Sequence, residues 1–211
     1  MKPFLISFLL LLTACASQAM PKNDADLVGQ PSTMTSAEAR AVSGLDAEYV
    51  VLYERLNQVC KLPPERPFGL TPDQMDCVVS RTVSAFGAEA GESGCRAQLE
   101  QGTFIGCIVD GTLLTLVAKN AGSADIPWEL FWSDQLGAWE RLNAVLNENA
   151  TKHCKSASQS DAAACQDDYV LRLFEIDRTA VAGCPTGWAR EDCVSGVATV
   201  KLIRSKLPYL F

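Results

Sequence analysis

Eight cysteines in two sets of four constrain this fold more than any other feature of the sequence. Successive cysteines are separated by 16, 17 and 11 residues in the first set and by 10, 18 and 8 in the second, with 46 residues between the sets. An even number of cysteines is typical of a disulfide framework where the compartment is oxidising. The two sets are Cys60, Cys77, Cys95 and Cys107, then Cys154, Cys165, Cys184 and Cys193.

A ninth cysteine, Cys15, ends an export signal. Lys2 supplies a positive start, and residues 4–12 form an apolar stretch too short to span a bilayer. The stretch leads into Leu-Thr-Ala-Cys15, which resembles the lipobox that lipoprotein signal peptidase recognises. The alternative is an ordinary secretory signal with a chance cysteine. We expect residues 1–14 to be removed and acyl chains on Cys15 to anchor the chain to a membrane.

The residues after Cys15 indicate where the chain is held. Ala16, in place of aspartate, indicates the outer membrane and a body that faces the periplasm, by similarity to Gram-negative sorting rules. Residues 15–34 are polar and contain proline and glycine, which predicts a flexible tether. The net charge is −7, and it becomes one unit more negative when Lys2 leaves with the signal. This charge argues against nucleic acid and against anionic lipid head groups as partners.

Helical periodicity predicts a first three-helix unit over residues 35–122. Thr35 and Glu38 have the spacing of a capping box, and the apolar face that follows continues to Cys60, where a proline-rich segment stops the helix. Thr71 starts a second helix, which we expect to fray over residues 91–94. A third apolar helix begins at Phe104 and ends near residues 120–122.

The same analysis predicts a second three-helix unit over residues 123–211, packed with the first as one body. Asp125 and Pro127 open a helix with a tryptophan stripe, which we interpret as core rather than as a binding platform. Ser160 is the candidate cap of the next helix, which carries Tyr169, Leu173 and Ile176; the last runs from near Trp188 to Pro208. A strand over residues 196–203 is the alternative there. Trp128, Trp132 and Trp139 form the stripe.

The two units have the marks of an internal duplication. Tyr53-Glu-Arg-Leu-Asn57 precedes the first set of cysteines, and Trp139-Glu-Arg-Leu-Asn143 precedes the second. Eight cysteines allow 105 pairings. On the helical map each cysteine lies near a helix end, so the economical pairing joins neighbours across each turn between helices. The expected bonds are Cys60–Cys77, Cys95–Cys107, Cys154–Cys165 and Cys184–Cys193.

No pattern of catalytic residues emerges, so we expect a protein that is not an enzyme and needs no cofactor. His153 is the single histidine, without a Cys-x-x-Cys motif or a second histidine to make a metal site. A hydrolase built on paired carboxylates is the alternative; solvated helix termini explain such pairs better. The pairs are Asp167 with Asp168, Glu191 with Asp192, and Asp73 with Asp76.

Two segments resemble the LprI-like family of periplasmic lysozyme-inhibitor-type proteins. In that family a helix with a tryptophan leads to a cysteine, and a second cysteine then starts a helix that bears an arginine. The matching residues are Trp139, Cys154, Cys165, Tyr169 and Arg172, and Leu45-Asp46 with Tyr49 and Tyr53 match a second pattern. This sequence departs from the family in having Asn143 where an arginine is usual and in lacking the family's early cysteine ahead of Leu45.

The resemblance implies an all-helical, disulfide-stapled module that binds an envelope hydrolase. We therefore expect a non-enzymatic protein-binding or inhibitor lipoprotein whose partner is another envelope protein, such as a lysozyme-like hydrolase. The acidic charge suits a basic partner of this kind. The alternative is a structural or assembly lipoprotein of the envelope.

Overall fold

A computed structural model describes residues 35–63, 70–96, 98, 103–122, 135–158, 161–186 and 189–211. Within these ranges every regular element is a helix, which confirms the expected all-α, disulfide-stapled bundle. Residues 196–203 are helical, so the strand alternative for them is wrong. The expected signal, the acylated Cys15 and the tether lie outside the described residues.

The first expected helix is in fact two helices, α1 (Ser36–Ser43) and α2 (Leu45–Cys60). The predicted capping box is present, because Thr35 accepts from the backbone N–H of Glu38 and the Glu38 carboxylate accepts from that of Thr35. The prediction of one continuous helix is wrong at Gly44, because a φ of 74° takes the backbone out of the right-handed helical region. Glycine adopts this conformation without the steric cost that a side chain would add.

The rest of the first half contains α3 (Pro72–Phe86), a single 3-10 turn η1 (Glu89–Gly91), α4 (Glu92–Arg96) and α5 (Phe104–Asn120). Thr71 and Gln74 form a second capping box. The expected fraying of α3 over residues 91–94 is wrong. The helix ends at Phe86 because Gly87 has a φ of 63°, and a separate short helix carries Cys95.

The second half contains α7 (Gln135–His153), α8 (Ala162–Leu173), the 3-10 turn η2 (Arg178–Val181), α9 (Ala189–Lys206) and the 3-10 turn η3 (Leu207–Leu210). Ile176 was expected on the helix of Tyr169, but it lies beyond the end of α8, where Glu175 has a φ of 56°. Pro208 lies within η3, two residues after α9 ends. Five predicted features fall outside the described residues: Asp125, Pro127, Ser160, Trp188 and the side chains of Trp128, Trp132 and Trp139.

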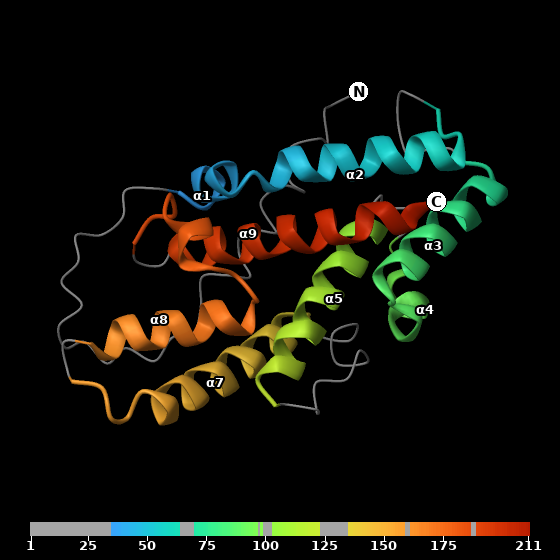
Figure 1. Cartoon of the computed structure of the whole chain (residues 1–211). Helices are drawn as coiled ribbons and strands as arrows, with labels where there is room; N and C mark the ends of the chain where they lie inside the picture. The colour runs from blue at the N-terminus through green and yellow to red at the C-terminus, as the bar shows by residue number, and fades with distance from the viewer. Residues whose placement is uncertain are drawn as a thin grey trace, which may run out of the picture.

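The helices enclose one core to which both halves contribute. In Figure 1, α9 lies along α1 and α2, α7 and α8 form a pair on the opposite side, and α5 lies between these two groups. Leu52, Phe104, Leu142 and Ile203 come from four different helices, are almost fully buried and belong to the same hydrophobic cluster. In each half a disulfide precedes a helix and a 3-10 turn, and a second disulfide follows them, although the first half also contains α1 and the short helix α4. An origin of the two halves in a duplication stays a prediction.

Candidate functional site

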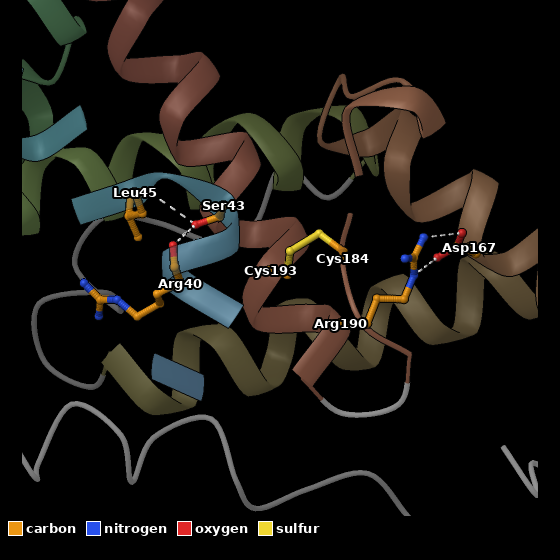
Figure 2. Close-up of a disulfide and its surroundings, with 7 residues drawn as sticks. All are labelled: Arg40, Ser43, Leu45, Asp167, Cys184, Arg190 and Cys193. Atoms are coloured by element: carbon orange, nitrogen blue, oxygen red, sulfur yellow. Dashed lines mark hydrogen bonds and ion pairs between the residues drawn. A yellow bond between two sulfur atoms is a disulfide. The ribbon is translucent and has the colours of Figure 1, made fainter. Parts of the chain in front are cut away.

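The cysteines form the four neighbouring pairs that the sequence predicts, and each pair closes a turn between helices. Their Cα atoms are 5.7 or 5.8 Å apart, and the paired residues are 17, 12, 11 and 9 positions apart in the chain. Figure 2 shows the last of them, between Cys184 and Cys193. Every cysteine in the described ranges is therefore bonded within its own half of the chain. These eight cysteines supply a scaffold rather than a nucleophile.

Three of the paired carboxylates form ion pairs with arginines. Arg190 donates to both oxygens of Asp167 at 2.7 Å, as Figure 2 shows. Arg178 Nε donates to Asp168 at 2.9 Å, and Arg96 donates to Asp76. These contacts join α8 to η2 and to α9, and α3 to α4.

The remaining acidic pair lies in the first turn of α9. Desolvation raises the pKa of Glu191, and the neighbouring charge of Asp192 adds to the effect. One carboxylate oxygen of Asp192 is buried, with no hydrogen-bond donor within reach in the described part of the chain. Consecutive helical residues point in different directions, so these two carboxyls do not face one another across a substrate. Asp73 is exposed at the start of α3.

A polar group that the sequence did not single out as functional lies on α5. Asp110 is the single charged residue between Phe104 and Ala118, and this isolation is the signal that the sequence offers. Surrounding protein atoms desolvate its carboxyl and raise its pKa to about 6, against the opposing effect of Arg40, although the side chain still reaches solvent. Burial and the charge of Asp110 together raise the pKa of Tyr49 on α2. Asp110 therefore loses its proton at a higher pH than an ordinary aspartate does.

Replacing Asp110 with asparagine should stabilise the protein at neutral pH. The pKa of the Asp110 carboxyl is higher in the folded protein than in the unfolded chain. As the pH rises from about 4 to about 6, the unfolded chain therefore releases this proton first, and the free energy of unfolding falls. Because the side chain reaches solvent, screening limits the gain in unfolding free energy for Asp110→Asn to about 1 kcal/mol. Urea unfolding of both proteins across this pH range measures it. If the gain in unfolding free energy is as large at acid pH as at neutral pH, the raised pKa of Asp110 is contradicted.

The end of α7 and the second half of α8 bring three further side chains together. His153 is the last residue of α7, and its ring lies 5.1 Å from that of Tyr169 on α8. Arg172 lies over the same tyrosine ring at 5.6 Å, and its Nη2 is 2.9 Å from His153 Nε2. Sequence reasoning considered His153 as a metal ligand and did not predict its contacts with Tyr169 and Arg172. The spacing of Cys165, Tyr169 and Arg172 is the signal that places them on one face of a helix.

A second exposed group lies where η3 meets α2. The side chains of Tyr209 and Phe211 are 67% and 65% exposed, and the guanidinium of Arg55 lies 4.8 Å from the centre of the Phe211 ring. Val51, one turn before Arg55 on α2, is also exposed. We call these four residues the η3 surface. Tyrosine and arginine are among the residue types that most often dominate protein–protein binding energies. In this group Tyr209 is exposed and Arg55 is partly buried.

Comparisons with protein-family models, curated proteins and solved structures give no match. The resemblance to the LprI-like family therefore stays a prediction. Of the residues that carry it, Tyr169 and Arg172 lie on α8 beside the Cys154–Cys165 bond, while the side chain of Trp139 is not among those that the structure describes. None of the helices that the structure describes combines the length and the apolar character needed to cross a membrane.

Proposed function

We propose that this protein is an outer-membrane lipoprotein that faces the periplasm and binds another envelope protein without catalysing a reaction. The proposed partner is a basic, lysozyme-like hydrolase, which the lipoprotein inhibits. Acyl chains on Cys15 hold it at the membrane, and residues 15–34 let the folded body reach its partner. The negative charge of the chain favours encounter with a basic protein.

The observation that carries this proposal is the η3 surface. Leaving two large aromatic side chains in water costs free energy that burial against a partner recovers. The disulfides and the common core hold α2 and η3 in place, so little conformational entropy is lost when this surface is covered. Three of the paired carboxylates that would have supported a hydrolase are ion-paired, which favours binding over catalysis.

Inhibition of a lysozyme-type muramidase by the oxidised mature protein, with Cys15 replaced by serine, tests this function. We expect inhibition, and we expect the double variant Tyr209→Ala, Phe211→Ala to bind the muramidase at least about tenfold more weakly, since buried aromatic anchors contribute most to such interfaces. Titration calorimetry gives the affinity and a turbidity assay gives the inhibition. Val42→Ala, which removes an exposed apolar side chain from α1, is the matched control and should bind normally.

Two outcomes would contradict this proposal. Absence of both binding and inhibition would remove the inhibitor function and favour the assembly lipoprotein, whose partners a pull-down from native envelopes would identify. Binding that survives loss of both aromatic side chains would place the interface away from the η3 surface.

A further inference from the structure

The first helix, α1, packs over the Cys184–Cys193 bond. Ala39 of α1 lies against Cys193 in a small cluster that is separate from the main core, and Cys184 borders the same cluster. Val42 of α1 lies over Gly183, because a Cβ added to that glycine would be 3.7 Å from Val42 Cγ1. Cys193 is fully buried in this arrangement, and Figure 2 shows α1 beside the bond.

The side chains that hold α1 in this position are small. Among the side chains of α1 that the structure describes, those of Ala39 and Ser43 are buried and the others are exposed. Apolar burial stabilises in proportion to area, so these two residues contribute little. The Arg40–Asp46 ion pair, which joins α1 to α2, is exposed at both ends and also adds little. The free energy needed to detach α1 is therefore small compared with that needed to unfold the whole protein.

Gly44 supplies the point at which α1 opens. Its positive φ already breaks the helix between α1 and α2, and glycine changes its backbone angles with little steric cost. Opening here breaks the hydrogen bond in which the Ser43 hydroxyl accepts from the N–H of Leu45 at 3.3 Å. Beyond the break, α2 places Leu52 and Leu56 in the main core. Detachment of α1 therefore leaves α2 in place.

We infer that α1 is a strap that shields the Cys184–Cys193 bond, and that its opening at Gly44 admits a dithiol reductant to this bond while the rest of the fold stays intact. A thiolate of the reductant forms a mixed disulfide with one cysteine sulfur, and the other sulfur leaves as a thiolate and takes up a proton. The second thiol of the reductant then loses its proton and releases the remaining cysteine. The reductant is thereby oxidised to its own disulfide, and the protein gains two thiols.

The same geometry makes the position of the strap depend on the bond. The disulfide fixes Cys184 and Cys193 beneath Ala39, so its reduction loosens the surface on which α1 packs. Because coupling between two equilibria is reciprocal, a bond that is easier to reduce when the strap is open also favours the open strap once it is reduced. This inference does not depend on the proposed inhibitor function.

Reduction measured bond by bond tests this inference. The oxidised mature protein, with Cys15 replaced by serine, is held in native buffer with dithiothreitol, and free thiols are alkylated at intervals. Peptide mapping then gives a reduction rate for each of the four disulfides. Ala39→Glu places a charge in the buried contact with Cys193. We expect the rate for Cys184–Cys193 to rise at least about tenfold and the other rates to stay unchanged, because burial of an unpaired charge disfavours the closed strap.

Ala37→Glu is the matched control. It makes the same substitution on the same helix, but the side chain of Ala37 is exposed, so all four rates should stay unchanged. If Ala39→Glu leaves the Cys184–Cys193 rate unchanged, the reductant reaches the bond from the partly exposed side of Cys184, and the inference is overturned. A rise shared by all four bonds would also overturn it, because α1 would then open only when the whole protein unfolds.

Amide hydrogen exchange of the protein without either α1 substitution gives a second test, which does not require a variant of the strap to fold. Local opening exposes little surface, so we expect the amides of α1 to exchange faster than those of α2, at rates that low concentrations of urea do not change. Equal protection of the two helices, or a dependence on urea as steep as that of global unfolding, would contradict the strap.

Discussion

Reduction of the four disulfides is expected to unfold this protein under conditions in which the oxidised form is fully folded. The paired cysteines lie 17, 12, 11 and 9 residues apart, and in the chain-entropy model loops of this size contribute about 3 kcal/mol each. Their combined contribution is similar to the whole stability of a typical domain, about 5–15 kcal/mol. Thermal unfolding followed by circular dichroism, with and without a phosphine reductant, measures the effect.

Titration of free thiols is the control that reduction is complete. A reduced protein that melts within a few degrees of the oxidised one would show that the core alone holds the helices together. Removal of single bonds provides a finer test. Cys95 and Cys107 are both buried in the common core, whereas Cys165 is only partly buried. The variant with alanine at residues 95 and 107 should therefore lose more stability than the variant with alanine at residues 154 and 165.

Local signals made much of this fold predictable from the sequence. The capping boxes at Thr35 and Thr71 set two helix starts, because each needs only residues three positions apart. The disulfide pairing followed from placing each cysteine beside a turn. The contacts of Arg172 with His153 and of Arg55 with Phe211 were not predicted, since they join residues 19 and 156 positions apart. Local patterns carry no information on which helices meet.

Glycines mark the other limit of sequence reasoning. Gly44 and Gly196 both lie in long apolar-periodic segments, and a helix tolerates an internal glycine at a cost of about 1 kcal/mol. Gly44 breaks its helix with a positive φ, whereas Gly196 lies within α9. Residue 196 has to be a glycine because α1, which is distant in sequence, packs directly on it. Only the packed structure distinguishes the two roles.

Small residues let α1 and α9 approach closely. Ala39 of α1 packs against Ala189 and Cys193 of α9, and one turn farther along α1 Ser43 lies on Gly196. The side chain of Ser43 is fixed from both sides, since its hydroxyl donates to the carbonyl of Arg40 at 2.6 Å and accepts from the N–H of Leu45 at 3.3 Å (Figure 2). It also helps to cap the break between α1 and α2. Ser43 cannot move without loss of these bonds.

Replacing Gly196 with alanine should therefore destabilise the protein, the opposite of the usual effect of this substitution in a helix. The new Cβ would lie 2.4 Å from Ser43 Oγ and 2.7 Å from Ser43 Cβ, so α1 has to move away from α9. Overpacking of this kind costs about 1–3 kcal/mol. Gly106→Ala on α5 is the matched control, because nothing lies within 4 Å of the position that the new Cβ would take there, and it should be neutral or stabilising by up to about 1 kcal/mol.

A double-mutant cycle in urea assigns this loss to the contact itself. Ser43→Gly removes both atoms that the new methyl group meets, although it also removes the hydroxyl that bonds Arg40 and Leu45. The two substitutions together should cost less than the sum of their separate effects, by at least about 1 kcal/mol. Additive effects would mean that the clash is relieved elsewhere. Since the seam of Ala39, Ser43 and Gly196 joins the first helix to the last, such additivity would also mean that α1 is not held on α9 by close packing.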